Sequence, residues 1–164
     1  RQYKNWCTRG IQVQMITDRL EIAASRMTLN LVCLEELADV AWSALEDGCD
    51  SLSLRMLAGL TRAEADQARA IFERALVELD ILVPSKRDAV IRLARETAEG
   101  ILRGTVGAYE GAKQIWELTL RAPDTDLPEL DSFVYAASEW EDRPEDARVF
   151  NEGVLAAARE LVGS

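Results

Sequence analysis

Histidine, the commonest general base and metal ligand in proteins, does not occur in this sequence of 164 residues. Its absence excludes Ser-His-Asp and Cys-His nucleophilic catalysis, and it also excludes the Glu-x-x-His pairs of carboxylate di-iron bundles. The three cysteines, at positions 7, 33 and 49, have neither a metal-binding nor a redox spacing. We therefore expect reduced thiols, no cofactor and no transition-metal site.

Carboxylates are plentiful, and one pair has a spacing that suits a hard cation. Glu35 and Asp39, in CLEELAD, are four residues apart and share a face of a predicted helix, where they could contribute to a Mg²⁺ site. Such a site needs further ligands that the sequence does not identify, so a solvated helix rim is the favoured interpretation. A magnesium-dependent helical enzyme is kept as an alternative. No phosphate-binding glycine loop, nucleophile elbow or dinucleotide fingerprint is present.

Residues 51–79 combine a short predicted helix, a glycine turn and a longer predicted helix, as helix-turn-helix DNA-binding proteins do. Arg62, Arg69 and Arg74 supply positive charge to the second helix. Four acidic side chains interrupt that charge: Glu64, Asp66, Glu73 and Glu78. Because carboxylates repel DNA phosphates, a helical hairpin in the core is the favoured interpretation. A DNA-binding regulator is kept as an alternative, but nucleic acid is not the partner we expect.

The segment SEWEDRPED, over residues 138–146, surrounds one tryptophan with acidic side chains. Local structure accounts for much of its charge, because Asp142 can cap a following helix and Pro144 suits the first turn of that helix. Trp140 follows Ala137 by three residues on an apolar stripe, which favours a core residue that seals the corner between two helices. The alternative is that Trp140 anchors a binding site.

Trp140, Tyr135 and Arg143 are our candidate partner-binding residues. Tryptophan, tyrosine and arginine are the residue types enriched at the energetic centres of protein interfaces, and these three lie within nine positions of one another. If they bind a partner, replacing Trp140 with alanine weakens binding with little loss of helicity. A variant that unfolds would instead place Trp140 in the core.

Apolar residues recur at helical spacing along almost the whole chain, so we predict an all-α fold with seven or eight helices in a bundle or irregular array. Gly48 and Gly104 are predicted to end helices, and Thr61 with Glu64 forms a capping box at the start of a long one. Gly111 marks a place of close backbone packing. Trp42 and Trp116 lie on apolar stripes and are predicted to be core residues.

Chain length fits one domain with one core, so we predict an irregular segment over residues 1–10 and a single helical domain over residues 11–164. No apolar run is long enough to span a membrane. The first ten residues do not form a signal peptide, which favours a cytoplasmic location.

The formal net charge is −10, which disfavours broad attraction to nucleic acid or to anionic lipid. From position 124 to the end, eleven acidic residues stand against three basic ones, so the last part of the chain is predicted to be an acidic lobe. Such a lobe is typical of a soluble acidic protein.

The segments GAYEGAKQIWEL and DSFVYAASEWEDRPED resemble an uncharacterised family of small, all-helical bacterial proteins. The resemblance covers mainly residues 107–146. It implies no catalytic or binding residue, but it favours an accessory or immunity-type bacterial protein. Together with the lack of a catalytic motif, it leads us to expect a non-catalytic protein that works by binding another protein or by self-association.

Overall fold

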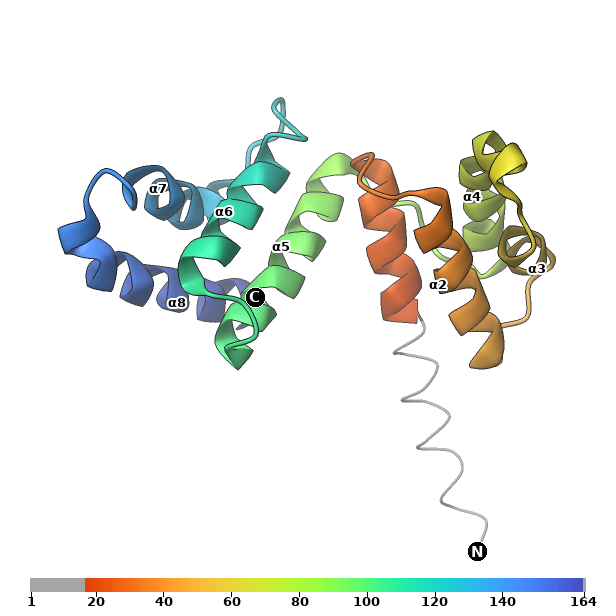
Figure 1. Cartoon of the computed structure of the whole chain (residues 1–164), viewed down its shortest axis with the longest axis horizontal. Coiled ribbons are helices and arrows are strands. Elements are labelled where there is room, and N and C mark those ends of the chain that lie inside the picture. The colour runs from red at the N-terminus through yellow and green to blue at the C-terminus, as the bar shows by residue number, and fades with distance from the viewer. Residues whose placement is uncertain (1–16, 164) are drawn as a thin grey trace, which may run out of the picture. The chain divides into compact units, whose positions relative to one another are not determined.

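The computed structural model describes residues 17–163, and all regular structure within them is helical (Figure 1). Residues 17–28 form a helix, and seven further α-helices follow, with three short 3₁₀ helices between them. The predicted all-α fold of seven or eight helices is therefore confirmed. None of the helices between residues 17 and 163 is long and apolar enough to cross a membrane.

The contacts between residues divide the chain into two compact units, one ending at Ser85 and the other beginning at Lys86. Buried side chains occur in both units, and those of the first unit form one apolar cluster. The domain boundaries of residues 11–164 stay a prediction, and the segment over residues 1–10 lies outside the described residues.

The first unit consists of the helix over residues 17–28 followed by three α-helices. They are α2 (Leu34–Glu46), α3 (Leu52–Ala58) and α4 (Ala68–Glu78), with the 3₁₀ helix η1 (Arg62–Gln67) before α4. Helix α3 packs against both α2 and α4. The core between them is apolar and contains Leu20, Met27, Leu37, Leu54, Leu57, Ile71, Phe72 and Leu76. Each such side chain contributes roughly 1.5–3 kcal/mol when it leaves water.

Left-handed residues end three helices of the first unit. Gly48 ends α2 with φ +93°, as predicted, and the N–H of Cys49 donates to the Ala44 carbonyl. Asn30 and Asp80 have the same left-handed conformation, with φ +55° and +57°. Both carry side chains that tolerate this conformation better than most. No glycine in the sequence marks these two helix ends.

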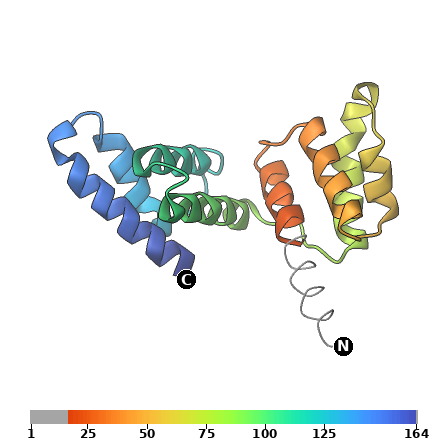
Figure 2. The ribbon, with the colours of Figure 1, turned by 60° about the horizontal axis from the view of Figure 1, so that its bottom comes forward.

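The second unit consists of α5 (Lys86–Arg103), α6 (Ala108–Thr119), α7 (Asp131–Glu139) and α8 (Ala147–Gly163). The 3₁₀ helices η2 (Pro128–Leu130) and η3 (Pro144–Asp146) lead into α7 and α8. Helix α5 packs against α6 and α8, and α6 also packs against α7 (Figure 2). The largest fully buried side chains of the second unit are Val90, Ile115, Leu130, Phe133 and Val154.

Glycine permits the close approach of α5 and α6. A Cβ atom placed on Gly111 would lie 2.5 Å from Cδ1 of Ile101, well inside van der Waals contact. The predicted close packing at Gly111 is therefore confirmed. Gly104 ends α5 with φ +73°, also as predicted.

Two predictions about the first unit need correction. The capping box of Thr61 and Glu64 is confirmed, but the helix after it begins as the 3₁₀ helix η1 and becomes α-helical only at Ala68. Trp42 was expected in the core, but 57% of its surface is exposed. The buried side of α2 is the narrow stripe of Leu37, Ala41 and Ala44, and Trp42 lies beside it. Trp116, the other tryptophan predicted to be a core residue, is half-buried in the second unit.

Candidate functional site

Three elements of the second unit bring a group of aromatic side chains together at one end of α7. Tyr109 lies in the first turn of α6, Tyr135 on α7 and Phe150 on α8. Trp140 follows α7 directly, and Arg143 precedes η3. We call these five residues the aromatic corner. It contains all three residues that the sequence analysis proposed for partner binding.

Trp140 is held between two other rings. The centre of its ring lies 5.4 Å from that of Tyr109 and 5.7 Å from that of Phe150, and the planes are tilted by 48° and 34°. Phe150 is 95% buried, whereas Trp140 is half-buried. Trp140 therefore links α6 to α8 across the corner, and aromatic pairs in this range contribute about 0.5–1.5 kcal/mol beyond the area they bury.

Arg143 joins Tyr135 to the corner. Its Nη2 donates a hydrogen bond of 2.6 Å to the Tyr135 hydroxyl, which raises the pKa of the guanidinium further. The guanidinium carbon lies 5.3 Å from the centre of the Phe150 ring and 5.9 Å from that of Tyr135, within cation–π range. Glu139 and Asp146 lie 3.4 and 3.8 Å from the Arg143 Nε. The arginine is thus fixed from several sides.

Tyr135 is the exposed member of the corner. Its ring meets Phe150 edge-on at 6.2 Å, yet 54% of the residue remains accessible to solvent. A tyrosine that is fixed by its neighbours and still exposed can bind a partner without losing much side-chain freedom.

Carboxylates surround the corner. The Tyr109 hydroxyl donates to the Glu141 carboxylate, and this bond raises the pKa of Tyr109. Asp142 and Glu145 are exposed beside it. The predicted capping role of Asp142 is wrong, because Arg143 occupies the N-cap position of η3 and its side chain makes no capping bond. Pro144 is the first residue of η3, which leads into α8, so its predicted place at the start of a helix is confirmed.

Sequence reasoning missed Tyr109 and Phe150 as members of this group. Phe150 and Tyr109 each occur among apolar residues at helical spacing, but nothing in the sequence links the two. Tyr109 and Trp140 are 31 positions apart, and only the packing of α6 against α7 brings them together.

The carboxylate pair proposed for magnesium lies on α2. Glu35 and Asp39 are both exposed, and the neighbouring Glu36 forms an ion pair of 2.7 Å with Arg26. Within residues 17–163, no three histidine, cysteine or acidic side chains are close enough to hold a metal ion. The described residues offer no third ligand beside Glu35 and Asp39. The magnesium-dependent enzyme stays an untested prediction.

The predicted helix-turn-helix segment forms α3, a connection over residues 59–61, η1 and α4. Three of its four carboxylates are bound within the unit. Glu64 accepts bonds from the backbone and hydroxyl of Thr61, Glu73 pairs with Arg69 at 3.2 Å, and Glu78 accepts bonds from two serines. Arg69 also donates to Asn30. With Arg69 engaged inside the unit, DNA binding by this segment stays an untested alternative.

Glu78 fixes the start of α3 to the end of α4. Its carboxylate accepts hydrogen bonds from the Ser51 hydroxyl and from both the backbone N–H and hydroxyl of Ser53. The bond from Ser51 and the two from Ser53 lower the pKa of Glu78 to about 2. Both serines are buried, so this cluster is part of the framework of the first unit.

No protein-family model matches the chain, and no match was found among curated proteins or solved structures. The resemblance to small helical bacterial proteins therefore stays a prediction.

Proposed function

We propose that this protein is a non-catalytic interaction protein and that it binds a positively charged protein partner through the aromatic corner. The observation that supports this best is the state of Tyr135, whose ring is exposed but held by Phe150 and Arg143. Fixed, exposed aromatic side chains lose little conformational entropy on binding, and tyrosine and arginine are typical anchors of interfaces.

The charge around the corner supports a basic partner. Glu141, Asp142 and Glu145 are exposed, whereas the single positive charge of Arg143 is already balanced by Glu139 and Asp146. Opposite charges across an interface increase the association rate, and salt weakens their effect. We also propose a cytoplasmic location, because Cys33 and Cys49 are free thiols and such thiols persist in reducing compartments.

The test compares Tyr135→Ala with Trp42→Ala. Both residues are exposed aromatics, 54% and 57% accessible, but Trp42 lies on α2 in the other unit. Each variant and the wild type would capture proteins from an extract of the cells that encode the chain. A captured protein would then be purified and its affinity measured by calorimetry at low and high salt.

We expect a basic protein that binds the wild type and Trp42→Ala equally, binds Tyr135→Ala at least about tenfold more weakly, and loses affinity as salt rises. Equal binding to both variants would refute the proposal, as would a partner whose affinity does not depend on salt. Circular dichroism must show that both variants keep their helical content.

A further inference from the structure

We infer that α4 carries a second interaction surface and that its occupant is a second copy of this chain. This inference uses residues of the first unit only, so it does not depend on the partner proposed for the aromatic corner. The surface, which we call the α4 face, is formed by Asp66, Gln67, Ala70, Glu73, Arg74 and Val77.

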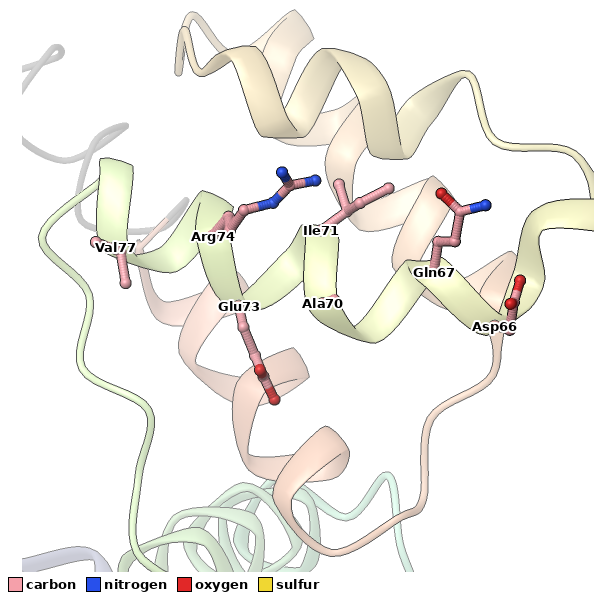
Figure 3. A pocket seen from close by; sticks show the side chains of 7 residues that line it. All are labelled: Asp66, Gln67, Ala70, Ile71, Glu73, Arg74 and Val77. Carbon is pink, nitrogen blue, oxygen red and sulfur yellow. The ribbon is translucent and has the colours of Figure 1, made fainter.

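A shallow groove runs along the α4 face (Figure 3). Two apolar side chains are exposed in it, Ala70 and Val77, and Val77 is 74% accessible. They are seven residues apart, which is two helical turns, and therefore form one line along the helix. Ala70 is small, so a second helix could approach closely at that point.

Charged and polar side chains lie on opposite flanks of this line. At 100° per residue, Glu73 falls on one side of Ala70, and Arg74 and Gln67 fall on the other. Figure 3 shows this arrangement, with Arg74 and Gln67 directed to one side of α4 and Glu73 to the opposite side. Asp66 lies in η1, before the α-helical turns, and Figure 3 shows its side chain on the same side as Gln67.

Such a face complements itself when two copies of α4 lie parallel and in register. A two-fold axis along the helix pair brings each flank against the opposite flank of the other copy. Arg74 then meets Glu73 of the second copy, and the same ion pair forms twice. An antiparallel pair brings like flanks together instead, so Arg74 would not face Glu73 of the second copy.

The existing ion pair of Glu73 does not prevent this arrangement. Glu73 pairs with Arg69 on its own helix, but both side chains are about half exposed. Exposed pairs of this kind contribute little and exchange easily. One helix from each copy makes a small interface, so the dimer should be weak and should form only as the concentration rises.

Sedimentation equilibrium of the full chain at increasing concentration tests the inference, with two charge reversals. Arg74→Glu places two carboxylates opposite each other at both pairs, and Glu73→Lys places two cations there. Each variant alone should dimerise at least about tenfold more weakly than the wild type. An equimolar mixture of the two variants should recover dimers, because both pairs are then attractive again.

Control variants should carry the same charge changes elsewhere. Arg148→Glu and Glu152→Lys alter exposed side chains of α8 and should leave the wild-type dimerisation unchanged. Melting followed by circular dichroism would show that every variant is folded. A wild type that stays monomeric at all concentrations would overturn the inference. So would a dimer that survives both reversals, or a mixture that fails to recover dimers.

Discussion

Trp140 and Tyr135 belong to one cluster but should respond differently to mutation. Trp140 is half-buried between Tyr109 and Phe150, so Trp140→Ala removes two ring contacts and leaves a gap at the corner. We expect the free energy of unfolding to fall by about 2 kcal/mol, somewhat less than for a fully buried tryptophan.

Urea unfolding followed by circular dichroism would measure this loss. Trp42→Ala, which removes a mostly exposed indole, provides the control and should change stability by less than about 1 kcal/mol. Equal losses for the two variants would show that Trp140 does not seal the corner. This is why Tyr135, and not Trp140, is the better position for a test of binding.

Glu78 should make the first unit sensitive to acid. Its pKa is about 2 in the folded chain, below the ordinary value of 4.5, because Ser51 and Ser53 donate to the carboxylate. A lowered pKa stabilises the fold fully above pH 4.5, and the contribution is lost as the pH falls towards 2.

We therefore expect Glu78→Gln to lose part of the acid dependence of stability between pH 4.5 and pH 2, as measured by urea unfolding at several pH values. Replacing Ser51 and Ser53 together with alanine removes both hydroxyl donors but leaves the backbone N–H of Ser53, and it should reduce the same dependence. If Glu78→Gln follows the wild type over this range, the hydrogen bonds do not hold the carboxylate in its charged form.

At the scale of single residues, the sequence predicted which residue types form a binding group better than it predicted which residues are in contact. It identified Trp140, Tyr135 and Arg143 as one group because they are close in the chain. It did not identify Tyr109, since a contact over 31 positions depends on helix packing. Trp42 was misplaced for a related reason: it lies next to Ala41 on α2, and periodicity alone cannot say how wide the buried side of a helix is.

Helix α6 requires glycine at the point where it crosses α5. A methyl group at position 111 would overlap Ile101, and Gly111→Ala should therefore destabilise the second unit by about 1–3 kcal/mol, although alanine favours helices. Gly153→Ala is the matched control, because Gly153 lies on α8 with nothing within 4 Å of the added atom. There, alanine should stabilise by up to about 1 kcal/mol.

Thermal melting of both variants would show whether Gly111→Ala destabilises the fold while Gly153→Ala stabilises it. Stabilisation by both substitutions would mean that α5 can move away from α6 at little cost. The comparison isolates packing from helix propensity, because both positions lie inside α-helices.

Most helices could be predicted from the sequence because apolar spacing and glycine caps leave direct marks in it. Gly48 and Gly104 are examples, since a left-handed residue is most often glycine. Asn30 and Asp80 end helices in the same conformation without that mark. Likewise, the capping pair of Thr61 and Glu64 predicts where a helix starts, but not that its first turns are 3₁₀.

At the scale of the whole chain, apolar content predicts how much surface is buried but not where the contacts divide the chain. The stripes of α2 and α5 look alike in the sequence, yet they belong to different units. The division falls next to exposed apolar side chains, since Leu82 is 89% accessible and Val83 is 47% accessible.

Because the aromatic corner and the core around Phe133 lie entirely after Lys86, residues 86–164 should fold without the rest of the chain. We expect this fragment to be helical by circular dichroism and to melt cooperatively, although a core of this size makes it only moderately stable. Trp140→Ala should lower its stability by the same amount as in the full chain, since mutational effects depend on local contacts. A fragment that is unfolded, or a loss that differs between the two by more than about 1 kcal/mol, would show that residues before Ser85 support the corner.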